Sequence, residues 1–169
     1  NSAHNDENLA LVLGGLTNGV TPLEMAEAYA TIANDGVHIT PTFYTKVEDS
    51  SGNIILEAKQ ESNRVISEGN AYILKSILTG PVIGADGTAG SAKISGQDTA
   101  GKTGTTDNNY DRWFCGFTNY YTAASLVDQL PFTSFSGFFM YVFFSTSGQF
   151  SFAIFPVSLQ IVNFSCPSQ

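Results

Sequence analysis

The stretch that decides how this chain is interpreted is Thr99-Ala100-Gly101-Lys102-Thr103-Gly104-Thr105-Thr106. Lys102 supplies a positive charge, the threonines supply hydroxyl groups, and the two glycines let a ligand approach the backbone closely. A cation and backbone N–H groups in such a segment suit an anion or a developing oxyanion. The stretch therefore predicts an anion-binding site, and two sequence patterns compete to define the anion.

The first pattern is the phosphate-binding loop G-x-x-x-x-G-K-[ST], which residues 96–103 (Gly96 to Thr103) match at every position. That loop needs a buried strand before it and a helix directly after it, whose N-terminus faces the phosphates. Residues 89–95 lack the Val/Ile run of a buried strand, and residues 104–109 are poor helix formers. A nucleotide-binding module is therefore an alternative that the surrounding sequence argues against.

The second pattern is Lys102-Thr103-Gly104 within an extended segment. Residues 105–106 are β-branched and continue a strand, residues 107–111 predict a polar turn, and residues 112–118 predict an aromatic second strand. Together they predict a β-hairpin. K-T-G is an element of penicillin-recognising serine enzymes. Three residues recur by chance, so the surrounding chain has to support this interpretation.

The composition sets broad limits on function. The chain has 169 residues, 43% of them hydrophobic, which corresponds to one domain or less. A net charge of −8 excludes the basic surface that nucleic acids require. The cysteines (Cys115, Cys166) and histidines (His4, His38) have no metal-ligand spacing, so we expect no metal and no cofactor. A disulfide between Cys115 and Cys166 is left open. The sequence does not start with a signal peptide, and its first residue, Asn1, is not a methionine, so we expect the chain to begin inside a longer one.

Two segments carry helix signals. Residues 21–34 begin with Thr21 as N-cap, with Glu24 placed to complete a capping box, and show a broad apolar face. Residues 67–79 predict a second helix with an apolar face, which Gly80-Pro81 should end. Both helices are expected to pack against a sheet.

The remaining segments predict strands and loops. Residues 8–20 indicate a strand or buried segment that enters a glycine-shaped loop. Residues 42–48 and 54–58 predict a hairpin at the periphery. The glycine-rich residues 84–92 lead into no helix, so we interpret them as a flexible connector rather than a phosphate loop.

Several sequence blocks occur in a fixed order over roughly residues 9–122. They are residues 13–26, 28–30, 33–36, 52–53, 65–67, 71–72 and 100–106, followed by Asp111, Trp113-Phe114 and Gly116-Phe117-Thr118. Together these blocks resemble the later part of the transpeptidase domain of class A (bifunctional) penicillin-binding proteins.

The resemblance implies an α+β fragment of the serine transpeptidase fold, with an antiparallel sheet and two packed helices. It also implies a part of an enzyme that cross-links peptidoglycan outside the cytoplasmic membrane. Its partners would be the D-Ala-D-Ala stem peptide and β-lactams, with no nucleic acid. The full-length protein would contact the membrane only through an N-terminal anchor, which this sequence lacks. The chemistry would be acyl transfer through a serine nucleophile, and the full-length protein would also hold a glycosyltransferase.

The same resemblance assigns roles to the central stretch. Lys102 would be catalytic and set the electrostatics and proton transfer near the nucleophile. The hydroxyls of Thr103 and Thr105 would bind the terminal carboxylate of the substrate, on a substrate-binding strand that continues to Thr106. The Thr105 N–H would form half of the oxyanion hole, and Gly104 would leave room for the acyl group.

In the family that this chain resembles, the nucleophile motif S-x-x-K and the second motif S-x-N both belong upstream of the region matched here, and no serine of the chain has a lysine three residues later. Without a nucleophile acyl transfer cannot occur, so we expect the chain alone to be inactive. A fragment of a serine β-lactamase or low-mass carboxypeptidase remains an alternative, although such enzymes would lack the 13–36 block. A purely structural remnant is the non-enzyme alternative.

The chain changes character near residue 124, so we expect a partial transpeptidase domain over residues 1–124 and an atypical tail over residues 125–169. The tail holds ten of the 13 phenylalanines and one charged residue, Asp128. A membrane-spanning helix over residues 135–155 and a run of strands are alternatives. Our preferred hypothesis is a reading-frame change or a chimeric gene prediction. Sequencing the gene through codon 124 tests it, because a one-base shift should restore a charged, family-like ending.

Overall fold

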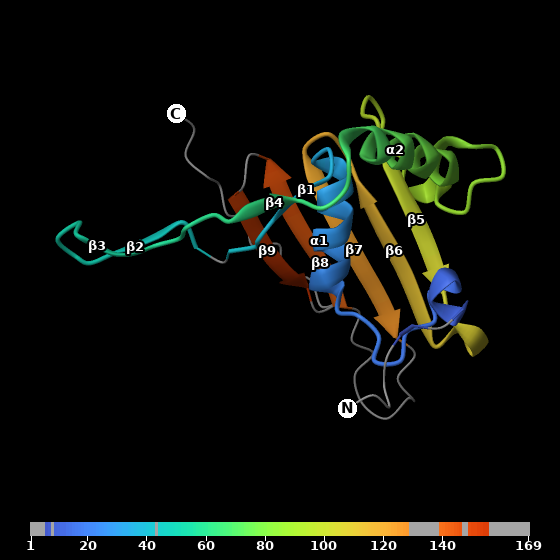
Figure 1. The fold of residues 1–169 in the computed structure, drawn as a ribbon, viewed down its shortest axis with the longest axis horizontal. Coiled ribbons are helices and arrows are strands. Elements are labelled where there is room, and N and C mark those ends of the chain that lie inside the picture. Colours follow the sequence, from blue (N-terminus) through green and yellow to red (C-terminus); the bar gives the residue numbers. More distant parts are fainter. Residues whose placement is uncertain (1–5, 8, 43, 129–138, 147–148, 156–169) are drawn as a thin grey trace.

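A five-stranded antiparallel sheet forms the centre of the fold (Figure 1). The computed structural model describes residues 6–7, 9–42, 44–128, 139–146 and 149–155. The strands are β5 (Ala100–Thr105), β6 (Asp111–Phe117), β7 (Tyr121–Asp128), β8 (Phe139–Thr146) and β9 (Gln149–Phe155), and they lie in chain order. Each strand pairs with the next one, as in a meander. Among the described residues no strand pairs with the outer side of β5, so this strand is an edge.

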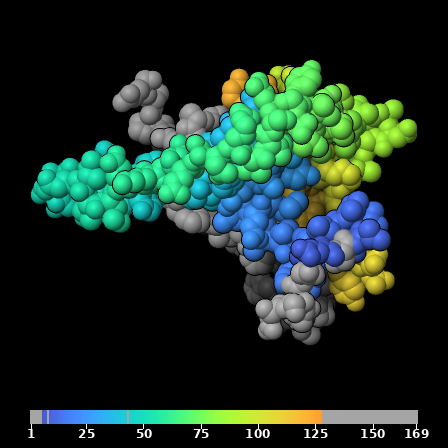
Figure 2. Space-filling view, in the orientation of Figure 1, coloured from blue at the N-terminus to red at the C-terminus, as the bar shows by residue number. Residues whose placement is uncertain are grey.

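Two α-helices lie on one face of this sheet (Figures 1 and 2). Helix α1 (Pro22–Ala33) crosses β6, β7 and β8, and helix α2 (Glu68–Ile83) lies beside β5 and touches α1. Ala26 of α1 is buried against Cys115 of β6 and Ala124 of β7. These small side chains allow the helix to approach the sheet closely. The predicted α+β fold with an antiparallel sheet and packed helices is confirmed.

The predicted start of α1 is confirmed in detail. The N–H of Glu24 donates to Oγ1 of Thr21 at 3.2 Å, and the N–H of Thr21 donates to Oε2 of Glu24 at 2.7 Å. Both hydrogen bonds of the capping box are therefore present. Residues after the helix turn sharply, because Asp35 and Gly36 both have positive φ angles, 53° and 84°.

The predicted end of α2 at Gly80-Pro81 is wrong. The helix continues to Ile83 and contains Pro81, and Ser67 caps it as expected. Pro81 cannot donate to the preceding turn, but so near the end of the helix it removes one hydrogen bond and its φ angle already suits a helix. The predicted apolar face, which includes Ala71, Ile73 and Ile77, is only partly used: Ala71 is buried, whereas Ile73 and Ile77 are 55% and 62% exposed.

The segment before α1 also differs from expectation. Residues Leu9–Leu13 form a short 3₁₀ helix rather than a strand, and Leu13 is 92% exposed. The N–H of Gly14 donates to the carbonyl of Leu11, and Gly14 has a φ angle of +86°. This tight turn ends the apolar run. The glycine-shaped loop that follows is confirmed.

Two small antiparallel pairs flank the main sheet. β1 (Val37–Ile39) pairs with β4 (Ser62–Arg64), and β2 (Lys46–Glu48) pairs with β3 (Ile54–Glu57). The β2–β3 hairpin extends away from the sheet (Figure 1), so the expected peripheral hairpin is confirmed. No helix in the described ranges is long and apolar enough to cross a membrane.

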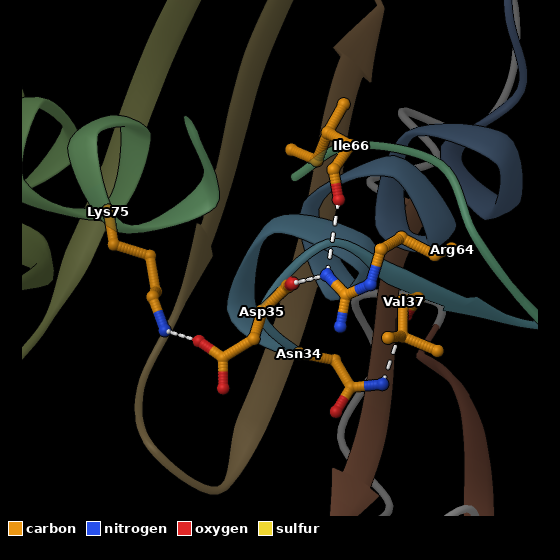
Figure 3. Close-up of polar contacts among 6 residues, drawn as sticks. All are labelled: Asn34, Asp35, Val37, Arg64, Ile66 and Lys75. Atoms are coloured by element: carbon orange, nitrogen blue, oxygen red, sulfur yellow. Dashed lines mark hydrogen bonds and ion pairs between the residues drawn. The ribbon is translucent and has the colours of Figure 1, made fainter. Parts of the chain in front are cut away.

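A polar junction joins the end of α1 to α2 and to the segment after β4 (Figure 3). The ammonium of Lys75 in α2 pairs with the carboxylate of Asp35. The guanidinium of Arg64 donates to the carbonyl oxygens of Asp35 and Ile66, at 2.7 and 3.2 Å. One turn therefore receives contacts from α2 and from the end of β4.

The sheet continues across residue 124, where the sequence changes character. β7 spans this position, and β8 and β9 extend the sheet over residues 139–146 and 149–155. The alternative of a membrane-spanning helix over residues 135–155 is therefore wrong, and the alternative of strands is confirmed for the described part. The boundary at 124 and the reading-frame hypothesis stay predictions. Cys166 lies outside the described residues, and so does the disulfide left open for it.

Candidate functional site

The K-T-G residues lie in the middle of the edge strand β5. In the antiparallel register with β6, Lys102 is opposite Cys115 and Gly104 is opposite Trp113. The connecting turn contains a short 3₁₀ segment, Asp107–Asn109. The predicted hairpin is thus confirmed. A phosphate-binding loop is excluded, because Lys102 and Thr103 belong to a strand, and this strand leads into the hairpin turn with its three-residue 3₁₀ segment rather than into an α-helix.

Antiparallel pairing decides which side chains share a face of the sheet. Residues directly opposite each other project to the same side, and successive residues alternate. Lys102 therefore shares its face with Cys115, and Cys115 contacts α1 through the core around Ala26. Thr103 and Thr105 project to the other face along the same edge. The ammonium and the hydroxyls thus reach the free edge of β5 from both sides.

The backbone of Thr105 faces outward from the sheet. The next residue, Thr106, donates its N–H to the carbonyl of Asp111 across the hairpin, at 3.1 Å. Successive N–H groups of a strand point to opposite sides. The N–H of Thr105 therefore points away from β6, toward the edge that no described strand covers. This is the orientation that an oxyanion-hole donor requires.

Lys102 is exposed, and its ammonium turns back to the same edge. Its Nζ donates to the carbonyl oxygen of Thr103 at 2.7 Å. None of the salt bridges formed within the described part of the chain involves Lys102. The positive charge is thus held at the strand edge by a neutral acceptor only, which leaves it available to a bound anion.

All five predicted site residues line one cleft of about 510 Å³. Its opposite wall comes from α1 and from the loop before it. Figure 2 shows this N-terminal segment, in blue, beside the yellow residues of the β5–β6 hairpin. The lining comprises Lys102, Thr103, Gly104, Thr105 and Thr106, then Leu13, Gly14, Leu16, Gly19, Val20, Met25 and Tyr29, and Asp111, Trp113, Cys115 and Leu126. The structure therefore brings the predicted residues together, and their catalytic roles stay predictions.

The thiol at the bottom of this cleft is not a nucleophile at neutral pH. Cys115 is 2% exposed, and burial raises its pKa to about 11. A thiol reacts as its thiolate, so this group is protonated and inert under ordinary conditions. Burial also raises the pKa of Tyr29, and the nearby Cys115 contributes in the same direction. The floor of the cleft is therefore uncharged.

Sequence reasoning missed two contributors to the site. Thr88, from the glycine-rich loop, places its Oγ1 2.8 Å from Oγ1 of Thr103. Asp111 closes the hairpin, because its N–H donates to Oγ1 of Thr106 at 2.9 Å. Sequence spacing did not predict either hydrogen bond, although Thr88 lies in the glycine-rich segment 84–92 and Asp111 in the polar turn 107–111. No cluster of metal-binding side chains occurs among the described residues.

A family model described as "Penicillin binding protein transpeptidase domain" matches residues 5–133. Penicillin-binding protein 1A of Clostridium botulinum is 40% identical over 122 residues, which is 72% of this chain and 15% of that protein. Penicillin-binding protein 1F of Bacillus subtilis is 39% identical over 125 residues, 70% of this chain and 17% of that protein. The chain thus spans about one sixth of the length of these relatives.

Solved structures give a similar result. The D,D-transpeptidase domain of a peptidoglycan glycosyltransferase from Eggerthella lenta aligns with a TM-score of 0.54 at 36% identity, covering 59% of this chain and 24% of that one. Penicillin-binding protein A from Mycobacterium tuberculosis, as an imipenem acyl-enzyme complex, aligns with a TM-score of 0.56 at 26% identity. That alignment covers 64% of this chain and 26% of the other.

Proposed function

This chain belongs to the transpeptidase domain family of the penicillin-binding proteins, and we propose that its edge strand β5 supplies the K-T-G side of a peptidoglycan D,D-transpeptidase site. In this proposal Lys102 provides the positive charge of the site, and Thr103 and Thr105 hold the terminal carboxylate of a D-Ala-D-Ala peptide. Thr106 continues the substrate-binding strand, and Gly104 leaves space for the acyl group.

One observation carries the proposal. The outward N–H of Thr105, the exposed ammonium of Lys102 and the Thr103 hydroxyl meet on a strand edge that no described strand covers. An extended peptide can lie along such an edge, and an outward N–H can stabilise the oxyanion of a tetrahedral intermediate. The penicillin-binding protein of Mycobacterium tuberculosis is described as an acyl-enzyme complex with imipenem, which supports β-lactams as ligands.

The reaction also needs a serine activated by a nearby base, and no serine of this chain has the S-x-x-K spacing. The nucleophile therefore has to come from a segment outside this sequence, and we propose that the chain alone is inactive. We also propose that it is the C-terminal part of the transpeptidase domain of a class A enzyme, placed outside the cytoplasmic membrane. The relatives named 1A and the domain taken from a peptidoglycan glycosyltransferase support this placement.

A fluorescent penicillin tests both parts of this proposal. The purified chain, incubated with the reagent, boiled and run on a denaturing gel, should carry no covalent label. A graft is then made, in which residues 9–128 of this chain replace the corresponding segment of Clostridium botulinum penicillin-binding protein 1A. The reagent should label this graft on the serine of the host protein. In the graft Lys102→Ala should slow labelling at least about 100-fold, because it removes an electrostatic and proton-transfer group.

Three results would contradict the proposal. A stable label on the chain alone would reveal a nucleophile that the sequence does not show. A graft that unfolds at the same temperature as its host but takes no label would show that this β5 edge does not build the site. Equal labelling rates for the graft and its Lys102→Ala variant would remove Lys102 from the mechanism.

A further inference from the structure

The glycine-rich loop after α2 does more than connect α2 to β5. We propose that Thr88 is a positioning residue, which aims the hydroxyl of Thr103 at the terminal carboxylate of the substrate. This inference rests on the proposed function, because it concerns the same carboxylate-binding hydroxyl. It assigns a role to a loop that the sequence alone presents as a flexible connector.

The loop is held against the end of α2. The N–H of Ala89 donates to the carbonyl of Pro81 at 2.9 Å, and the N–H of Gly87 donates to the carbonyl of Gly84 at 3.0 Å. The last carbonyls of a helix lack partners within the helix, so the loop satisfies one of them. A Cβ atom on Gly87 would lie 2.3 Å from the Pro81 oxygen, so only glycine permits this approach. Ala89 is 5% exposed, and Thr88 is therefore fixed between two anchored residues.

The contact between the two hydroxyls has a direction once a carboxylate is present. Oγ1 of Thr88 lies 2.8 Å from Oγ1 of Thr103, and either hydroxyl can donate. A hydroxyl has one hydrogen and two acceptor sites. If Thr103 donates its hydrogen to a carboxylate, it has to accept from Thr88. The Thr88 hydroxyl thus fills the acceptor side of Thr103, fixes its χ1 rotamer and polarises its O–H bond toward the ligand.

Thr88 acts through Thr103 rather than as a separate anion site. A hollow of about 460 Å³ lies beside the loop and is lined by Thr88, Lys102 and Asp86, among others. The carboxylate of Asp86 on this wall disfavours a second anion there. The ammonium of Lys102 turns instead to the β5 edge, where it donates to the carbonyl of Thr103. A ligand carboxylate is therefore expected at the edge, next to the Thr103 hydroxyl.

The test uses the graft described above and two forms of one β-lactam, benzylpenicillin and its methyl ester. Thr88→Val should lower the acylation rate constant for the acid about fivefold, the effect of one neutral hydrogen bond. Thr88→Ser, which keeps the hydroxyl, should stay within about twofold of the wild type. The methyl ester should react equally with all three proteins, because the ester does not present a carboxylate to Thr103. Thr45→Val, an exposed threonine ahead of the peripheral hairpin, is the matched control and should change nothing.

A second readout needs no acylation and uses the 169-residue chain. Three-bond couplings to the Thr103 methyl group should report one χ1 rotamer in the wild type and in Thr88→Ser, and averaging over rotamers in Thr88→Val. If Thr88→Val does not fold, Thr88→Ala takes its place. A graft that takes no label would contradict the proposed function, but the couplings would still test whether Thr88 fixes the rotamer of Thr103. Unchanged couplings in Thr88→Val, or an equal loss of rate for acid and ester, would overturn the inference.

Discussion

Replacement of Gly36 by alanine tests how the turn after α1 holds the structure together. Gly36 has a φ angle of +84°, and a Cβ atom there would lie 2.3 Å from the carbonyl oxygen of Ile66. The N–H groups of Val65 and Ile66 both donate to the carbonyl of Gly36, at 2.9 and 3.3 Å. The obstructing atom is therefore backbone that is itself pinned to Gly36. Moving it away stretches these two hydrogen bonds.

Two other glycines separate the steric effect from backbone strain. Gly52 and Gly96 have φ angles of +83° and +78°, and a Cβ atom on either would meet nothing within 4 Å. A left-handed conformation costs alanine about 1–2 kcal/mol, and the stiffer unfolded chain returns about 0.4–1 kcal/mol. Both controls should therefore lose about 1 kcal/mol. Gly36→Ala adds a close contact that costs about 1–3 kcal/mol, so its total loss should be about 2–4 kcal/mol.

Urea unfolding followed by tryptophan fluorescence measures these differences, because the chain has a single tryptophan, Trp113 on β6. The midpoint should fall much further for Gly36→Ala than for Gly52→Ala or Gly96→Ala, with similar slopes for all three. Gly96 lies shortly before β5 and is a second control, because Gly52 lies in the peripheral β2–β3 hairpin, which could unfold separately from the sheet. Equal midpoint shifts for Gly36→Ala and both controls would refute the steric reasoning.

Three further predictions concern single side chains. Thr21→Ala removes the capping box of α1 and should lower the free energy of unfolding by about 1 kcal/mol in urea, whereas Thr21→Ser should lose little; equal losses would argue against the cap. Lys75→Met should lower the free energy of unfolding by less than about 1 kcal/mol, because its partner Asp35 is 57% exposed and the ion pair is weakened by water. A loss above about 2 kcal/mol would contradict this. In a Cys166→Ser background, Cys115 should resist a disulfide reagent at pH 8, because burial raises its pKa to about 11. In the unfolded chain the Cys115 thiol loses its proton near pH 9.0, whereas in the folded protein it does so at a pKa of about 11. The contribution of this thiol to the free energy of unfolding is therefore complete below pH 9.0 and is lost as the pH rises through the folded pKa. Cys115→Ala should remove this part of the pH dependence of stability, measured by urea unfolding.

Local signals in the sequence predicted the parts of the fold that depend on near neighbours. The capping box at Thr21 and the two hairpins involve contacts a few residues apart, and each was confirmed. The same holds for the site, because Lys102 to Thr106 are consecutive residues of one strand and its turn. Their shared position on one hairpin could therefore be predicted, whereas the opposite wall of the cleft comes from α1 and the loop before it and was not predicted.

Interactions between distant segments could not be predicted in the same way. The apolar face of α2 predicted a helix packed on the sheet, but Ile73 and Ile77 in that face are exposed, because burial depends on which element lies opposite. The end of α2 was misjudged since Pro81 is tolerated when few helical residues follow it. The contact of Thr88 was not predicted, because its partner, Thr103, is 15 residues away and the tertiary fold brings the two together.

The free edge of β5 has a consequence for solubility. A strand edge that admits an extended peptide also offers its N–H and carbonyl groups to the edge of another protein molecule. Lysine on an edge strand opposes such pairing by its charge and its cost of dehydration. Lys102 is therefore expected to keep β5 from pairing with other copies of the chain. Any Lys102 variant should be checked for self-association before a loss of labelling is assigned to chemistry.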